Sequence, residues 1–210
     1  MTCSSSLADD LTPLVLDTSV LINLCACSLG EQILTAIPNA IAVPDIVARE
    51  LGHETSRNNG EHQFLEGLLA RKKVQQVSLD EAGWTIFERL TTSHSSLGDG
   101  EAATIAIATT SAHRPVIDDA KGRRSIEVLI GKRTAAWSLD LLLHPNVQER
   151  LENDSYIEAI YLALREGRMR IDEERCDIIV ELIGVERALQ CPSLPGFKAR
   201  RERWKREFAR

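Results

Sequence analysis

Residues 14–24 read LVLDTSVLINL, and this stretch decides the fold class. Its first three residues are apolar, which predicts a short buried strand. Asp17-Thr18-Ser19 follow at once, and a second apolar run over residues 20–24 suits a helix that begins at this point. A strand that opens directly into a helix is the first half of a β-α unit, which indicates a parallel sheet covered by helices.

The same strand-to-helix pattern recurs along the chain. Further strands are predicted at 41–43, 74–79, 115–117 and 133–137, and helices at 45–51, 62–73, 80–90, 98–112 and from 120 onward, with a polar loop at 53–61. Beyond His144-Pro145 the pattern is helical, with helices at 156–165 and 172–189. We therefore expect an α/β, three-layer fold with a central parallel sheet, organised as a main domain (1–145), a helical extension packed on it (146–196) and a basic tail (197–210).

Composition narrows the class of protein. A chain of 210 residues with 43% apolar residues can bury one sizeable core plus an appendage. No apolar run approaches the roughly 20 residues of a membrane helix, and the first residues lack the order of a signal peptide, so we expect a cytoplasmic protein without membrane contact. The five cysteines are scattered without a CxxC pair, which disfavours zinc and redox chemistry.

Charge is distributed unevenly. The chain carries −6, but residues 197–210 hold seven basic residues against two glutamates and so carry +5, which leaves −11 on the rest. The tail can bind RNA phosphates, dock onto the acidic body or remain disordered, and the sequence leaves these alternatives open. Trp204 and Phe208, four residues apart, would form one apolar helix edge and so favour docking.

Acids recur where strands end and helices begin. These acids are Asp17, Glu50, the pair Asp99 and Glu101, and the pair Asp118 and Asp119. Each has a simpler interpretation as a helix cap, a turn residue, a partner of a helix dipole or a solvated side chain. Because strand ends of a parallel sheet meet at one edge, we expect Asp17 and Asp118 to project from the same edge and Glu101 to point toward it.

Converging carboxylates would repel one another unless a divalent cation neutralised them. Oxygen ligands without clustered His or Cys favour Mg or Mn over zinc. Such sites serve in-line displacement at phosphorus, in which metal ions activate water and stabilise the leaving oxygen.

Four segments in order, LVLDTSVLINL, VPDIVAREL, LGDGEAATIAIA and VIDDAKGRR, resemble the four blocks of PIN domains. The similarity runs from Leu14 to Leu189 and is closest to a bacterial branch whose third block reads GEA and whose fourth reads DD followed by GRR. It implies a Mg- or Mn-dependent endoribonuclease that cuts RNA, often the toxin of a toxin-antitoxin pair of the VapC type, with an antitoxin protein as partner. It also implies a homodimer.

The resemblance assigns roles residue by residue. Asp17, Glu50, Glu101 and Asp119 match the catalytic acids, and Ser19 matches the small polar residue that supports Asp17. The metal ligands expected are Asp17, Glu101, Asp118 and Asp119. The fourth block has Ile117 where the family has Thr, so the choice between Asp118 and Asp119 stays open, and a metal role for Asp99 is disfavoured.

Arg123 and Arg124 follow the last acids by about one helical turn, where they could contact an RNA phosphate or form ordinary structural pairs.

Two other functions compete with a nuclease. A phosphatase of the haloacid dehalogenase type needs a second acid two residues after its nucleophilic Asp, and here that position is Ser19. A nuclease fold that has lost catalysis and binds RNA or protein as a regulatory module is the other alternative, although every acid position is filled.

Overall fold

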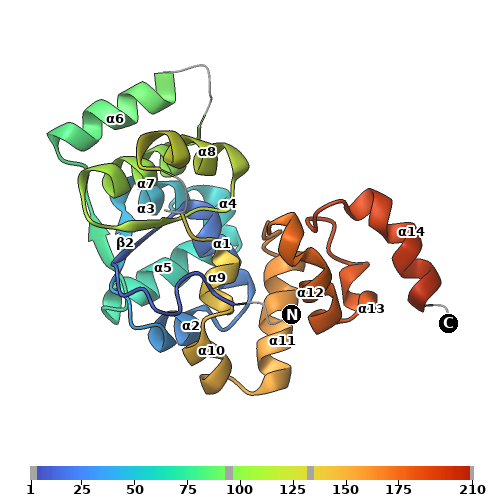
Figure 1. Ribbon diagram of the computed structural model, residues 1–210. Coiled ribbons are helices and arrows are strands. Elements are labelled where there is room, and N and C mark those ends of the chain that lie inside the picture. The colour runs from blue at the N-terminus through green and yellow to red at the C-terminus, as the bar shows by residue number, and fades with distance from the viewer. Residues whose placement is uncertain (1–3, 93–96, 132–134, 209–210) are drawn as a thin grey trace. The chain divides into compact units, whose positions relative to one another are not determined.

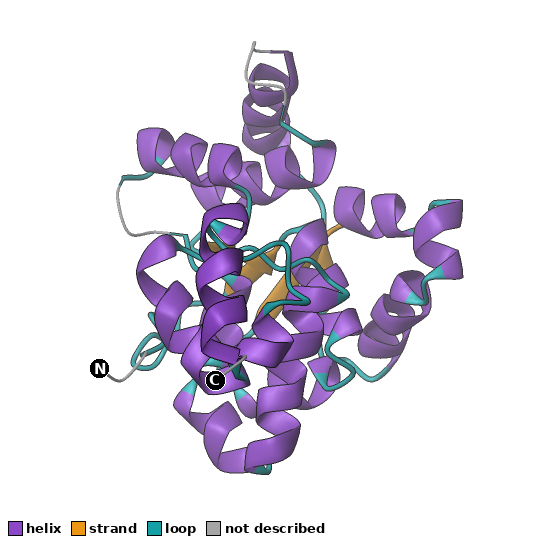
Figure 2. Ribbon diagram, turned by 90° about the vertical axis from the view of Figure 1, so that its right-hand side faces the viewer, coloured by secondary structure: helices purple, strands orange, loops and turns teal. Residues whose placement is uncertain are grey.

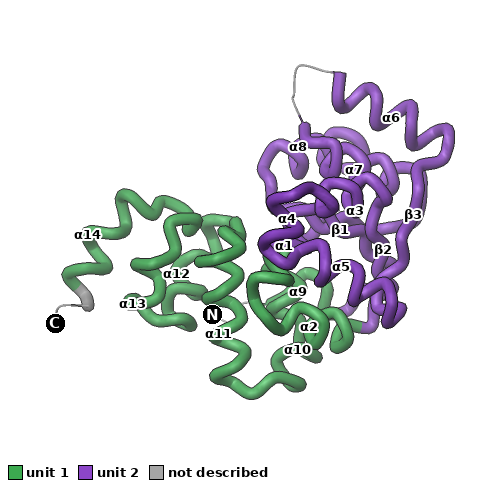
Figure 3. Tube along the Cα trace, turned by 180° about the vertical axis from the view of Figure 1, so that it is seen from behind, with its two compact units in different colours: residues 1–8, 23–37, 138–210 green, residues 9–22, 38–137 purple. Residues whose placement is uncertain are grey.

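The computed structural model describes residues 4–92, 97–131 and 135–208 of the chain (Figure 1). By its internal contacts the chain divides into two compact units (Figure 3). One unit, the sheet unit, comprises residues 9–22 and 38–137, and the other, the helical unit, comprises residues 1–8, 23–37 and 138–210. The expected division at residues 145 and 196 stays a prediction.

The sheet unit is built on four parallel strands in the order β3-β2-β1-β4. Their bounds are Leu14–Leu16 for β1, Ile41–Pro44 for β2, Gln75–Val77 for β3 and Arg114–Val116 for β4. The strands are short beside the helices (Figure 2). The expected fold class, a central parallel sheet flanked by helices with a helical extension after it, is confirmed.

Helix α7 (Asp99–Thr110) is the central helix of this unit and contacts β1, β2 and β4. Its residues 102–108 are all buried, and most are alanine or isoleucine, so the helix backbone can approach the sheet closely. Helices α6 (Glu81–Thr92) and α8 (Ala120–Leu129) both pack against α7 (Figure 1). The first turn of α7 is thereby fixed beside the carboxyl ends of the strands.

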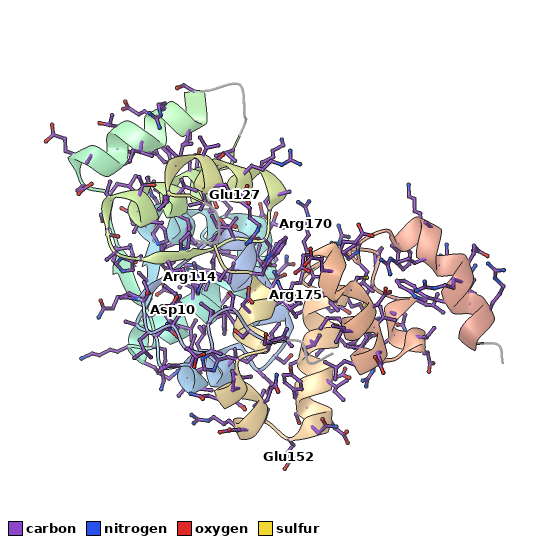
Figure 4. The ribbon with its side chains drawn as sticks, in the orientation of Figure 1. Asp10, Arg114, Glu127, Glu152, Arg170 and Arg175 are labelled. Atoms are coloured by element: carbon purple, nitrogen blue, oxygen red, sulfur yellow. The ribbon has the colours of Figure 1, made fainter. Side chains whose placement is uncertain are left out.

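The remaining helices of the sheet unit follow β2. They are α3 (Asp45–Leu51), α4 (Glu54–Asn58) and α5 (Glu61–Ala70), which contact one another, while α3 also contacts α7. At the amino-terminal end of β4, Arg114 donates to Asp10 at 2.7 Å and the two side chains lie side by side (Figure 4). This ion pair lies at the other end of the strand from the predicted acids.

The described part of the helical unit contains only helices and loops. The helices are the end of α1 (Thr18–Ala26), α2 (Gly30–Ala36), α9 (Ser138–Leu142), α10 (Pro145–Arg150), α11 (Asn153–Arg165), α12 (Glu173–Ile183), α13 (Val185–Ala188) and α14 (Phe197–Phe208). The buried carboxylate of Asp140 accepts from Arg175, at 3.0 Å, and from the backbone N–H of Ser6, at 2.9 Å. Figure 4 labels Arg175, the cation of this ion pair.

The basic tail forms helix α14 and is docked within the helical unit. Trp204 is 1% exposed and its ring contacts that of Phe197 at 6.0 Å between centroids. Arg200 pairs with Asp177 and with Glu173 of α12. Docking onto an acidic surface is therefore the alternative that the described residues show.

Several local predictions differ from the structure. Helix α4 lies where a polar loop was predicted, and the helix predicted over 172–189 is broken at Gly184, whose φ of +86° is left-handed. Helix α2 was not predicted. The predicted last strand falls partly on residues 132–134, outside the described residues, and Ala136 forms a single parallel bridge to Val116.

Among the described residues, no single helix is long and apolar enough to cross a bilayer, and only α1 and α2 taken together as a bent pair meet that test of length and composition. The four described cysteines form no disulfide.

Candidate metal and catalytic site

The register of the sheet brings two predicted acids to the same edge. Leu16 is paired with Val116, and the backbone N–H of Asp17 donates to the carbonyl of Val116 at 3.3 Å. Asp17 follows β1 by one residue and Asp118 follows β4 by two, so both leave neighbouring strands at their carboxyl ends. Each is only 3% exposed. Two buried carboxyl groups therefore begin on adjacent strands at one sheet edge.

Asp17 opens helix α1 and is oriented by Ser19. The Ser19 hydroxyl donates to Oδ2 of Asp17 at 2.7 Å, and the Ser19 backbone N–H lies 3.3 Å from the same oxygen. Burial nevertheless raises the pKa of Asp17, because the hydrogen bonds only partly offset desolvation, and the negative charge of Glu50 raises the pKa further. Ser19 thus contacts Asp17 as a supporting residue would, and Glu50 is close enough for mutual repulsion.

Glu50, near the end of α3, joins three segments. Its Oε1 accepts from the backbone N–H of Gly100 at 2.8 Å, and its Oε2 accepts from the hydroxyl of Thr18 in a short hydrogen bond. A Cβ on Gly100 would overlap both Glu50 Oε2 and the Thr18 oxygen and would lie 3.1 Å from Glu50 Cδ. The first turns of α1 and α7 therefore close on Glu50 only because residue 100 is glycine.

Glu101 lies between the first turn of its own helix and helix α8. Its Oε2 accepts from the backbone N–H of Gly98 at 3.3 Å. A Cβ on Gly122 of α8 would lie 3.0 Å from Glu101 Oε1 and 3.0 Å from a methyl carbon of Ile117. Glu101 thus lies against the start of α8, directly after the aspartate pair. Asp99, two residues earlier, is exposed.

The two aspartates after β4 have different surroundings. Asp119 is the N-cap of α8, where its Oδ1 accepts from the backbone N–H of Lys121 at 2.7 Å, and it is partly exposed. Asp118 is buried. The capping interpretation weighed for this pair therefore applies to Asp119, and Asp118 is the one whose charge is withdrawn from water.

The contacts thus connect all the predicted acid-bearing segments, yet the described side chains are not arranged as a complete metal-binding site. Within residues 4–92, 97–131 and 135–208, no three His, Cys, Asp or Glu side chains are arranged so that they would hold a metal ion as they stand. Glu50 and Glu101 also accept hydrogen bonds from protein donors, so a cation would compete with those donors. The donor set is all oxygen, which fits Mg or Mn.

The two arginines predicted to contact substrate differ. The Arg123 guanidinium donates to three backbone carbonyls and lies 3.9 Å from the centre of the Trp137 ring. These contacts match the structural alternative stated for it. Arg124 is exposed.

The family model for the PIN domain matches residues 13–184. The chain belongs to the PIN-domain family. PIN domains are generally nucleases and generally use divalent metals, so membership places this chain in a nuclease family. The match continues past Trp137, so the family model includes helices α9 to α12 as well as the sheet. The VapC-type branch stays a prediction. Searches of curated proteins and of solved structures gave no match.

Some residues of this PIN domain were predicted to belong to the site, and others that contact them were not. The acids of all four blocks were predicted, but Thr18, Gly100 and Gly122, which contact those acids, were not. Their signal lay in the quoted blocks themselves, because residues 18 and 100 belong to the DTS and GDGEA runs and residue 122 to DDAKGRR.

Proposed function

We propose that this chain is a metal-dependent endoribonuclease that hydrolyses RNA phosphodiester bonds with Mg or Mn. The observation that carries the proposal is the connected set of contacts at the sheet edge: Glu50 accepts hydrogen bonds from Thr18, which follows Asp17, and from Gly100, which precedes Glu101, and Glu101 lies against α8. Chain segments far apart in sequence thus bring acids to one place in a fold whose family is nucleolytic.

In this proposal Asp17, Glu101 and Asp118 hold the cation, with Asp119 at the edge of the site. A divalent cation bound there would supply the charge that activates water and stabilises the leaving oxygen. Ser19 orients Asp17 through its hydroxyl, and Thr18 and Gly100 orient Glu50. Of the aspartate pair, Asp118 suits direct ligation because Asp119 already uses one oxygen to cap α8.

The test is incubation of the purified chain with single-stranded RNA and Mn²⁺, with and without chelator. We expect cleavage that the chelator stops and that Asp17→Asn and Glu101→Gln each reduce at least about a hundredfold, since each removes a charged ligand. Asp99→Asn is the matched control, because Asp99 is an exposed acid in the same helical turn as Glu101, and its activity should stay near that of wild type. Chelator-resistant cleavage, or equal loss in all three variants, would refute the assignment.

The competing functions make different predictions. A phosphatase of the haloacid dehalogenase type would hydrolyse small phosphomonoesters, but residue 19 donates to Asp17 as a serine and has no acid to offer a leaving group. A catalytically silent module would bind RNA or a protein, and its Asp17→Asn variant would act as well as wild type.

We propose three further properties together with this activity. These are a toxin role with an antitoxin protein as partner, a homodimer and action in the cytoplasm. A small reading frame beside this one, whose product binds the chain and inhibits cleavage, would support the toxin role. Light scattering of the purified chain measures its mass and so tests the dimer.

A further inference from the structure

Arg123 lies in the first half of α8, and its guanidinium donates hydrogen bonds to backbone carbonyls. Its Nη1 donates to the carbonyl of Ile117 at 3.1 Å and to that of Ala136 at 3.0 Å, and its Nη2 donates to the carbonyl of Ala135 at 3.2 Å. Its own backbone N–H donates to the carbonyl of Asp119 at 3.1 Å. One residue therefore contacts carbonyls of the segment before α8 and of the segment after it.

These carbonyls belong to the two segments that are joined by the parallel bridge between Val116, at the end of β4, and Ala136. The backbone N–H of Ile117 donates to Ala136 at 3.0 Å, and the N–H of Ala136 donates to Pro115 at 2.8 Å. The Ala136 carbonyl thus accepts from Ile117 and from Arg123 together. The Ile117 carbonyl belongs to the peptide bond that joins Ile117 to Asp118, so the Arg123 contact fixes the plane from which Asp118 departs.

The chemistry of this contact is specific to arginine. A planar guanidinium can serve several acceptors in one plane while its face lies on the Trp137 ring, whereas a lysine ammonium is a compact point charge. Ile117 and Ala136 are fully buried, so water has little access to replace the charged donor. These contacts restrain the backbone beside Asp118, and a metal ligand needs a fixed backbone.

We propose that Arg123 is a positioning residue that sets the orientation of Asp118, rather than a residue that binds the RNA phosphate. The proposal rests on the proposed function in one respect: Asp118 is taken to be a metal ligand. Groups that orient metal ligands typically change metal affinity or activity by about 10–100-fold when they are mutated.

The experiment compares Arg123→Gln and Arg123→Lys with Arg124→Gln, which removes the same charge from the exposed neighbouring residue. Hydrogen exchange is measured over residues 115–120 in the metal-free proteins, and Mn²⁺ binding is measured by calorimetry without RNA. We expect faster exchange in this segment and roughly 10–100-fold weaker Mn²⁺ binding for Arg123→Gln. Arg123→Lys should fall between Gln and wild type, and Arg124→Gln should match wild type in both measurements.

Each other outcome has a defined meaning. Unchanged exchange in Arg123→Gln, or faster exchange with wild-type Mn²⁺ affinity, overturns the positioning role, and the second result would leave Arg123 a purely structural residue. RNA binding is measured separately, and weaker RNA binding of Arg123→Gln with unchanged Mn²⁺ affinity overturns the positioning role in favour of a phosphate contact. If Arg123→Gln does not fold, Arg123→Lys carries the comparison. A wild-type chain that binds no Mn²⁺ refutes the proposed function and with it the positioning role, whereas wild-type Mn²⁺ binding with no effect of Arg123→Gln overturns the positioning role alone.

Discussion

Substituting Gly100 by alanine tests whether the site is assembled by close contact at the first turn of α7. The added Cβ would overlap Glu50 Oε2 and the Thr18 hydroxyl, so Glu50 must move. It would then lose or weaken two hydrogen bonds, one from Thr18 and one of 2.8 Å from Gly100. Hydrogen bonds to a charged group contribute about 1.5–3 kcal/mol each when they are not replaced.

The net effect is smaller than the sum of these bonds. Glu50 is half-buried, so water takes over part of the lost hydrogen bonding, and alanine stabilises a helix by about 1 kcal/mol relative to glycine. We therefore expect Gly100→Ala to lower the free energy of unfolding by about 2 kcal/mol. Gly98→Ala is the matched control, because there the nearest atom to an added Cβ is Glu101 Oε2 at 3.9 Å and φ is −65°. Its effect should be within about 0.5 kcal/mol of zero.

Urea unfolding followed by tryptophan fluorescence measures both variants, since Trp84 and Trp137 lie in the sheet unit. The cleavage assay is run alongside, and Gly100→Ala should lose more activity than Gly98→Ala because it displaces a predicted catalytic acid. If both glycine variants are as stable and as active as wild type, Glu50 is not held by the first turns of α1 and α7, and the geometric basis of the site is wrong.

Three further predictions concern separate parts of the chain. Trp204→Ala should lower the free energy of unfolding of the helical unit by about 3–5 kcal/mol, measured by urea unfolding. Trp84→Ala is the control, because Trp84 is 42% exposed, and it should cost about 1 kcal/mol or less. Similar losses in the two variants would show that α14 is not docked. Because burial raises the pKa of Asp17 above its ordinary value of 3.8, the metal-free native state binds more protons than the unfolded state between pH 3.8 and the folded pKa, and its stability falls as the pH rises through that window. In chelator, the melting temperature of Asp17→Asn should therefore rise relative to that of wild type as the pH rises from 3.8 through the folded pKa of Asp17, and a difference that stays constant from pH 4 upward would contradict this. Burial raises the pKa of Cys27 and of Cys191 to about 11, so iodoacetamide at pH 8 should leave both unmodified in the folded chain, as mass spectrometry of digests would show; rapid labelling of either would contradict their burial.

The sequence predicted the frame of the fold because that frame depends on local patterns. A short apolar strand that ends in an acid and runs into a helix is visible in any single β-α unit, as at residues 14–24. The errors fell where local patterns mislead. Residues 54–58 are polar and still form α4, and the apolar periodicity of residues 172–189 continues through Gly184, where the backbone turns to a positive φ.

The acids at the ends of the strands could be named from the sequence, whereas their contacts could not. Thr18 and Glu50 are 32 residues apart, and Glu50 and Gly100 are 50 apart, so no local pattern can show that they bond. The same limit applies to Arg123, which follows two aspartates by about one helical turn and was predicted to bind phosphate or to form a structural pair. Two of its three carbonyl contacts depend on the return of residues 135–136 to the sheet edge.

The nature of these contacts bears on why a cation suits the site. Asp17 is oriented by a serine hydroxyl and Glu50 by a threonine hydroxyl and a backbone N–H, which are neutral donors. Neutral donors fix the direction of a carboxylate without cancelling its charge, so burial, with a further contribution from the charge of Glu50, still raises the pKa of Asp17. An arginine in their place would have neutralised the pair, and the arginine that follows Asp118 and Asp119 by about one turn instead donates to carbonyls. Negative charge that is held in place but not neutralised favours a divalent cation, and the binding of that cation would offset the destabilisation that the uncompensated acids cause.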